Sequence, residues 1–252
     1  MLHLGNALIC KKTFYKLPFK LFLAKHLFQV YVSFTMNTAN QNLNLQDNEK
    51  DWKAIAWEYA QAIIIALVLA LFIRTFVVQA FKIPSGSMIH TLLIGDHILV
   101  NKFIYGIKNP LTRSTLIDVG QPEHGDIVVF IFPLDRKKDF IKRVIGTAGD
   151  TVQVINKKVF VNGKPIKEAE GVQHTKAEII PGNIQPRDNF GPVTVPEGHI
   201  FVMGDNRDES FDSRYWGFVP LKDVKGKAFM IYWSWNSEKF MPRLDRIGDI
   251  LH

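Results

Sequence analysis

The chain has 252 residues, and its 47% hydrophobic and 12% aromatic side chains are enough to build a core, which excludes disorder of the whole chain. The formal net charge of +7 is unevenly distributed, because residues 1–46 hold five lysines and no acidic residue. Residues 47–252 therefore retain 26 basic and 24 acidic side chains. A general nucleic-acid binder needs a basic face on its folded domain, and this part is nearly neutral, so we expect no nucleic-acid partner.

Metal and disulfide chemistry find little support in the sequence. Cys10 is the single cysteine, so no disulfide can form within the chain. The sequence has no CxxC pair and no HExxH motif, and its eight histidines are scattered singly. We expect neither a metal nor a cofactor.

Residues 1–35 form a basic leader in which lysines interrupt each apolar run, so this segment cannot comfortably span a bilayer. Met36 then opens a polar, Asn/Gln-rich linker, 36–53, which we expect on the cytoplasmic side. One hypothesis is that Met36 is the true start and that residues 1–35 are an upstream artefact. The alternative is a basic segment that lies on the membrane surface.

Residues 54–78 are predicted to form a transmembrane helix. Tyr59 to Ile73 is an uncharged apolar run, and extension to Ala54 and Val78 gives a helix of bilayer length with its charges near the ends. The alternative is a buried helix of a globular core. It is disfavoured because the sequence shows no other strong helical pattern against which such a helix could pack.

Residues 79–252 are predicted to form a mainly β, antiparallel domain. Short runs of β-branched and aromatic residues, such as GDIVVFIF and HIFVMG, are separated by Gly, Pro, Asn and Asp. Within a predicted insert at about 151–196, TVQVINKKVFVNGKPI alternates apolar and polar residues across an Asn-Lys-Lys turn and then meets Asn-Gly. This pattern is typical of β-hairpins.

Three segments have residues suited to chemistry, although each has an ordinary structural interpretation by itself. The Ser-Gly-Ser at 85–87 presents hydroxyl and amide groups but also suits a simple turn. Lys142 lies in an apolar strand, and strand alternation places it on the face of Phe140 and Val144. Burial would lower the pKa of this lysine and yield a neutral amine able to accept a serine proton. The polar segment 203–220 would then hold a catalytic side chain in place.

In order along the chain, these segments resemble those of the bacterial type I signal peptidases. The matching motifs are PSGSM at 84–88, GDIVVF at 125–130, IKRVIG followed by GD at 141–150, and GDNRD followed by DSRYWG at 204–217. YGIKNP at 105–110 and RIGDI at 246–250 are most similar to the Gram-negative branch. The resemblance implies a membrane-bound serine endopeptidase that cleaves signal peptides after small residues of the Ala-x-Ala type.

The resemblance also implies roles for individual residues. Ser87 would be the nucleophile and Lys142 the general base, while the Ser85 hydroxyl and the Ser87 amide would form the oxyanion hole. Three further residues would orient the lysine and hold its loop: Ser210, Asp212 and Arg214. Four apolar residues are predicted to line the substrate pockets: Phe81, Ile83, Phe140 and Ile141.

Two features depart from the family pattern. His90 stands where the family usually has proline, which makes a histidine base conceivable, either His90 or His97 beside Asp96. In addition, the sequence has one convincing span where Gram-negative relatives commonly have two. We expect a single-pass protein of the inner membrane with its catalytic domain on the periplasmic side.

Two alternatives to a general signal peptidase remain open on the sequence. One is a serine-lysine peptidase that cleaves itself or one dedicated partner. The other is a membrane-tethered, non-catalytic β-domain that binds extended peptides by strand addition. Trp233 and Trp235 in IYWSWN could contact the membrane interface, although alternating aromatic residues also occur in ordinary strand packing.

Overall fold

The computed structural model describes residues 52–108, 115–117 and 119–251. The predictions about the leader 1–35, the start at Met36 and most of the linker 36–53 lie outside these residues. The chain forms two compact units, residues 1–63 and 64–252, and the boundary falls inside its long helix.

The long helix α2 extends over Trp52–Phe72 and is followed by a π-helical turn, Ile73–Val77. Its middle consists of Ala, Ile and Leu without Gly or Pro, a composition that suits an uninterrupted helix. Its described side chains are mostly exposed, although they are apolar. Among the described residues, α2 is the one helix that is long and apolar enough to cross a membrane. The predicted span ends at Val78, and in the structure the helical backbone ends one residue earlier, at Val77, with Val78 as the first residue of a strand.

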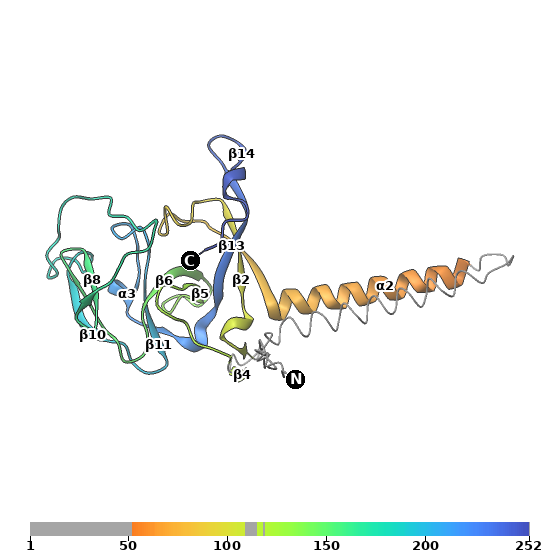
Figure 1. The fold of residues 1–252 in the computed structure, drawn as a ribbon, viewed down its shortest axis with the longest axis horizontal. Coiled ribbons are helices and arrows are strands. Elements are labelled where there is room, and N and C mark those ends of the chain that lie inside the picture. The colour runs from red at the N-terminus through yellow and green to blue at the C-terminus, as the bar shows by residue number, and fades with distance from the viewer. Residues whose placement is uncertain (1–51, 109–114, 118, 252) are drawn as a thin grey trace, which may run out of the picture. The chain divides into compact units, whose positions relative to one another are not determined.

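The largest sheet has eight antiparallel strands in the order β1-β2-β13-β5-β6-β11-β12, with β14 paired to the far end of β13 (Figure 1). The long strand β13 therefore joins β2 to β5 in the centre of the sheet. The bounds are β1 Val78–Lys82, β2 Asp96–Asn101, β5 Ile127–Ile131, β6 Asp139–Gly146, β11 His199–Met203, β12 Val219–Pro220, β13 Val224–Asn236 and β14 Met241–Pro242.

A smaller antiparallel sheet has the order β10-β7-β8-β9, with β7 Thr151–Ile155, β8 Lys158–Val161, β9 Lys164–Pro165 and β10 Phe190–Thr194. Two tight turns connect β7 to β8 and β8 to β9. Asn156 and Lys157 have φ of 47° and 71°, and Asn162 and Gly163 have φ of 53° and 75°. Positive φ at both central residues matches the twist of hairpin strands, and Asn and Gly tolerate it best.

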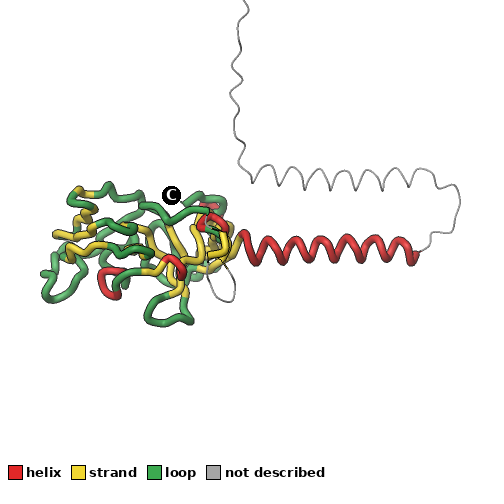
Figure 2. The backbone as a smooth tube through the Cα atoms, turned by 90° about the horizontal axis from the view of Figure 1, so that it is seen from below, coloured by secondary structure: helices red, strands yellow, loops and turns green. Residues whose placement is uncertain are grey.

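The other elements are short, and strands and loops dominate residues 78–251 (Figure 2). A separate pair joins β3 Ile107–Lys108 to β4 Thr115–Ile117. One helical turn, α3, covers Ser213–Trp216, and 3₁₀ turns cover Phe103–Tyr105, Leu221–Asp223 and Leu244–Arg246. The predicted fold class, mainly antiparallel β preceded by one apolar helix, is confirmed.

Strand β6 separates the apolar core into clusters because its side chains alternate between two faces. Ile141 belongs to a cluster with Ile83 and Met88, whereas Val144 belongs to a second cluster against which Phe140 packs. Ile145 joins a third cluster, formed with the small sheet. The side chain of Lys142 therefore lies on the same face of β6 as Phe140 and Val144, which contact the second cluster.

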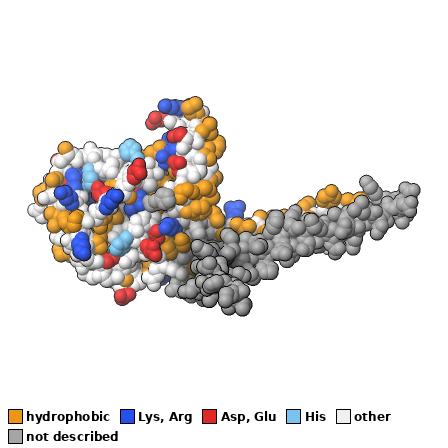
Figure 3. Space-filling model, viewed as in Figure 1, with side chains coloured by type: hydrophobic (Ala, Val, Ile, Leu, Met, Phe, Trp, Pro, Cys, Tyr) orange, Lys and Arg blue, Asp and Glu red, His pale blue; other side chains and the backbone are white. Residues whose placement is uncertain are grey.

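Apolar side chains also reach the surface along β13 and β14, which form a projection in Figure 3. Trp233 is 39% exposed, Met241 52% and Phe240, in the turn between the strands, 82%. Large apolar groups with this much exposure are candidates for a contact surface.

Candidate active site

Ser87 lies in the turn that follows β1, between Ile83 and the start of β2. Gly86 and Ile89 close this turn through a hydrogen bond from Ile89 N to Gly86 O of 3.2 Å. Met88, fully buried, anchors the next residue in the core. The buried side chain of Met88 and the turn before it leave Ser87 half-buried at the edge of the core.

Lys142 reaches Ser87 from the middle of β6. Its Nζ donates to Ser87 Oγ at 2.7 Å and to Ile141 O at 3.0 Å. The side chain is buried, with the residue 4% exposed, and burial lowers the pKa of Lys142 to about 8. The charges of Asp212 and Asp205 act in the opposite direction, so they limit the lowering. Near pH 8, therefore, both the neutral and the protonated form of the amine are populated beside the serine hydroxyl.

The ring of Phe140 lies 5.3 Å from Lys142 Nζ, on the face that strand alternation predicted. Phe140 in turn stacks on Phe132, with ring centroids 4.2 Å apart and an interplanar angle of 7°. These rings exclude water from one side of the amine, which contributes to the burial that lowers its pKa.

The loop after β11 contacts the turn that holds Ser87. Asn206 N donates to Ser87 O at 3.1 Å, and Asp205 N points at the sulfur of Met88 at 3.4 Å. The carboxylate of Asp205 accepts two hydrogen bonds from Arg143, at 2.9 and 2.7 Å, and one from the Thr91 hydroxyl. The loop is thereby attached both to β6 and to the segment just after the nucleophile.

Asp212 and Arg214 form a buried pair that holds the same loop from behind. Arg214 donates to Asp212 at 2.9 and 2.8 Å, and Gly204 N donates to Asp212 at 3.0 Å. Arg214 also donates to the backbone oxygens of Arg187 and Arg207. Burial alone would raise the pKa of Asp212, but the charge and hydrogen bonds of Arg214 outweigh it, so the pKa is lowered. The aspartate stays ionised near Lys142.

Ser210 and Ser87 approach each other across Gly204. A Cβ atom at Gly204 would overlap Ser210 Oγ and would lie 2.5 Å from Ser87 O, so only glycine fits between them. The Ser210 hydroxyl is buried without a hydrogen-bond partner among the described residues. It lies close enough to Asp212 to lower that pKa, although not in hydrogen-bond geometry.

The remaining predicted site residues fall into two groups. Ile83 and Ile141 are buried in one cluster, Phe81 packs against it, and Phe140 packs against the neighbouring cluster. Ser85 is exposed, two residues before Ser87.

His90 is exposed, and the contacts of His97 and Asp96 give no support to a histidine base. Asp96 accepts from Ser234 Oγ at 2.6 Å and from Arg246 at 2.7 Å. His97 follows on the opposite face of β2 and packs edge-on against Tyr232, with ring centroids 5.9 Å apart. The two side chains therefore engage different partners, and the hydrogen bond to Ser87 comes from Lys142.

Sequence reasoning missed the residues that connect the segments. Arg143, Asp205 and Asn206 stand inside the motifs that suggested the family, but no role was assigned to them. An arginine in an apolar strand beside a candidate base is a signal, because a buried guanidinium needs a carboxylate partner. Which carboxylate it pairs with depends on a contact 62 residues away.

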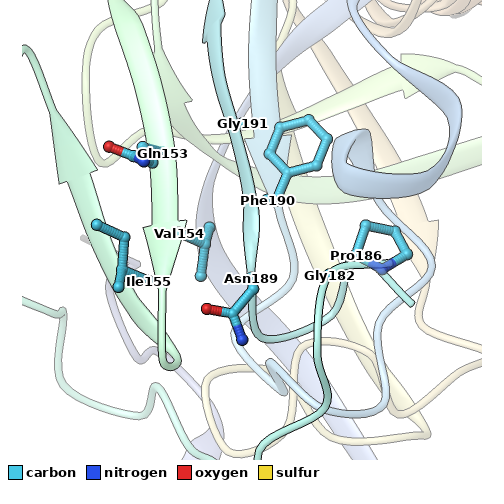
Figure 4. Close-up of a pocket in the computed structure, with 8 residues that line it drawn as sticks. All are labelled: Gln153, Val154, Ile155, Gly182, Pro186, Asn189, Phe190 and Gly191. Atoms are coloured by element: carbon cyan, nitrogen blue, oxygen red, sulfur yellow. The ribbon is translucent and has the colours of Figure 1, made fainter. Parts of the chain in front are cut away.

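A hollow of about 360 Å³ lies in the small sheet (Figure 4). It contains none of the predicted site residues, and its lining consists of Gln153, Val154, Ile155, Gly182, Pro186, Asn189, Phe190 and Gly191. In the part of the chain that the structure describes, no group of three or more His, Cys, Asp or Glu residues could hold a metal ion.

A buried lysine in hydrogen-bond contact with a serine hydroxyl is the arrangement that a serine hydrolase with a lysine base requires. Comparison with known proteins agrees with this class. A family model described as signal peptidase, peptidase S26, matches residues 56–233. The chain belongs to this family.

Similar proteins include signal peptidase I of Pseudomonas fluorescens, 39% identical over 221 residues that cover 76% of this chain and 78% of that protein. Signal peptidase I of Pseudomonas aeruginosa is 37% identical over 226 residues, which are 77% of this chain and 78% of that protein. A crystal structure of a signal peptidase I from Enterococcus faecalis is 31% identical. It covers 43% of this chain and 97% of that chain, with a TM-score of 0.34.

Proposed function

We propose that this chain is a membrane-bound serine endopeptidase that removes signal peptides from exported preproteins. The signal peptidase family supports the substrate class. The single observation that carries the chemistry is the 2.7 Å hydrogen bond between Lys142 Nζ and Ser87 Oγ in a buried setting.

In the proposed reaction, neutral Lys142 accepts the proton of Ser87 Oγ as the oxygen attacks the scissile carbonyl carbon. The carbonyl oxygen becomes an oxyanion, which the Ser87 N–H and the Ser85 hydroxyl stabilise. Lys142 then gives the proton to the leaving amine, and the signal peptide remains as an ester on Ser87. Water, activated by the same amine, hydrolyses that ester.

Ser210, Asp212 and Arg214 support this chemistry from behind the amine. The Asp212 charge favours the protonated form of Lys142, and Arg214 opposes it, so the pair adjusts the pKa that burial sets. The hydroxyl of Ser210 is buried without a hydrogen-bond partner among the described residues, and it is proposed to orient the amine of Lys142.

The proposed substrate pockets use the apolar residues beside the pair. Ile83 and Ile141 are buried in one cluster against which Phe81 packs, and these residues are proposed to form walls of shallow pockets that accept small side chains. Phe140 borders Lys142 on the other side. Shallow apolar pockets of this kind suit cleavage after Ala-x-Ala.

The proposed location is the inner membrane, with α2 as the single span and the catalytic domain on the periplasmic side. The length and composition of Trp52–Leu71 support the span. The exposed apolar residues of β13 and β14, including Trp233, are proposed to contact the lipid interface.

A non-catalytic peptide-binding domain is disfavoured, because strand addition needs neither a serine nor a buried lysine in hydrogen-bond contact. A peptidase with one dedicated partner shares the same chemistry. Cleavage assays on several unrelated preproteins with Ala-x-Ala ends distinguish a general signal peptidase from a dedicated one, since a dedicated peptidase would process none of them.

The test is cleavage of a model preprotein by the full-length chain in detergent. We expect Ser87→Ala and Lys142→Ala to lose about 10⁴-fold or more in kcat, because the residues of such a unit act together. The wild-type rate should rise with pH through about 8, as the amine loses its proton. His90→Ala is the matched control and should keep most activity. An active Ser87→Ala variant would contradict the proposal.

A further inference from the structure

Asn206 contacts the nucleophile turn at two successive carbonyl groups. Its backbone N–H donates to Ser87 O at 3.1 Å, and its side-chain Nδ2 donates to Gly86 O at 3.2 Å. Asn206 is 6% exposed, so its end of both bonds is largely shielded from solvent. Both bonds join segments about 120 residues apart, and neither was anticipated from the sequence.

The bond to Gly86 O has a consequence for the amide of Ser87. The Gly86–Ser87 peptide is trans, and the C=O and N–H of a planar trans peptide point in opposite directions. A donor that holds Gly86 O on the side of Asn206 therefore turns the Ser87 N–H to the other side. Ile89 N also donates to Gly86 O at 3.2 Å, so the turn and Asn206 together fix this peptide plane.

An asparagine side chain at position 206 is not expected to maximise the stability of the folded chain. Its Oδ1 is buried without a hydrogen-bond partner among the described residues. A buried acceptor left unpaired is costly, and an apolar side chain of similar size would avoid that cost. Within the described part of the chain, Nδ2 is the end of the amide that has a partner, and that partner is Gly86 O.

We propose that Asn206 is a positioning residue that aims the Ser87 N–H at the oxyanion. The inference rests on the proposed function, in which that N–H stabilises the tetrahedral intermediate. A donor contributes to catalysis only when it points at the position of the developing negative charge. Misdirection of the donor therefore lowers the stability of the transition state more than the affinity for substrate.

The test uses Asn206→Leu in the full-length chain, which keeps the backbone N–H and the side-chain size but removes Nδ2. We expect kcat on a model preprotein to fall about 10- to 100-fold, less than complete loss of an oxyanion donor. KM should change by about twofold at most. The rise in rate should stay near pH 8, because Lys142 keeps its contacts.

A second measurement separates positioning from general structural damage. An Ala-x-Ala peptide aldehyde forms a tetrahedral adduct on a serine and therefore reports the oxyanion hole directly. Asn206→Leu should weaken binding of this aldehyde by the same factor as kcat/KM. The matched control is Asn189→Leu, which removes a similar Nδ2 bond, 3.0 Å to Ile180 O, beside the small sheet. That variant should keep kcat and aldehyde affinity.

Unchanged kcat in Asn206→Leu, with Ser87→Ala inactive, would overturn the positioning role and leave the proposed function intact. A shift of the pH profile in Asn206→Leu would also overturn it, because the residue would then act through Lys142. Activity in Ser87→Ala would instead refute the proposed function.

Discussion

The two faces of β6 treat a buried positive charge in opposite ways. Arg143 is 3% exposed and pairs with Asp205 through two hydrogen bonds. Lys142, the preceding residue, is 4% exposed and donates to a serine hydroxyl and a carbonyl instead of a carboxylate. Burial therefore lowers the pKa of Lys142 to about 8. On one face the cation is neutralised by a carboxylate, and on the other it is the proposed base.

The lowered pKa of Lys142 also predicts how the free energy of unfolding depends on pH. A base whose pKa is lowered in the folded chain binds its proton less tightly there than in the unfolded chain. The free energy of unfolding then rises with pH between about 8 and the ordinary value of 10.5. Below pH 8 the full cost of the buried ammonium is present.

The largest expected effect is that of Lys142→Met. Activity should be lost about 10⁴-fold, while the free energy of unfolding at pH 7 should rise by up to about 3 kcal/mol. This gain should disappear above pH 10.5, where the lysine is neutral in both states. Denaturant unfolding at several pH values measures it. Lys158→Met, at an exposed position of β8, is the control. Equal destabilisation at all pH values would contradict the comparison.

Arg143→Met should lower the free energy of unfolding, whereas Lys142→Met should raise it. It leaves Asp205 buried without its ion-pair partner, so we expect a loss of about 3–5 kcal/mol in the free energy of unfolding. The double variant Arg143→Met, Asp205→Asn should be less destabilised, because no uncompensated charge remains. Denaturant unfolding of both variants tests this. A double variant less stable than the single one would mean that the pair does not act through charge.

Asp212→Asn should shift the pH dependence of the remaining activity. The charge of Asp212 raises the pKa of Lys142, and Arg214 lowers it. Removal of the aspartate charge should therefore move the rising limb of kcat to lower pH, which a pH profile of preprotein cleavage measures. Asp139→Asn, at the exposed start of β6, should leave the limb in place. A limb that moves to higher pH would exclude this electrostatic role.

The smallest effect is expected at that same exposed end of β6. Asp139 pairs with Lys225 at 2.7 Å, but both side chains are 31% exposed. A surface pair of this kind contributes little, so Asp139→Asn should change the free energy of unfolding by about 0.5 kcal/mol or less. A loss comparable to that of Arg143→Met would show that distance, and not burial, decides the value of an ion pair here.

The prediction of the fold rested on the alternation of side chains in the strands and on the residues of the turns. The alternation around Lys142 correctly placed it with Phe140, since the period of a strand is fixed by its backbone. The turns at Asn156–Lys157 and Asn162–Gly163 have the positive φ that these residues favour. The end of the helix was less predictable. The apolar run continues past Phe72, and composition alone does not mark where the helix stops and β1 begins.

The sequence by itself determined the β-rich class, the apolar helix and the family, and it indicated Ser87 and Lys142 as the candidate pair, because periodicity and ordered motifs are local properties. Only the tertiary structure decided that Lys142 is buried, that its amine lies 2.7 Å from Ser87, and that Arg143, its neighbour, is neutralised by Asp205. It also revealed the two bonds from Asn206. Burial and charge pairing depend on contacts between segments that are far apart in the chain. Such contacts set the pKa of Lys142 and the direction proposed for the Ser87 amide.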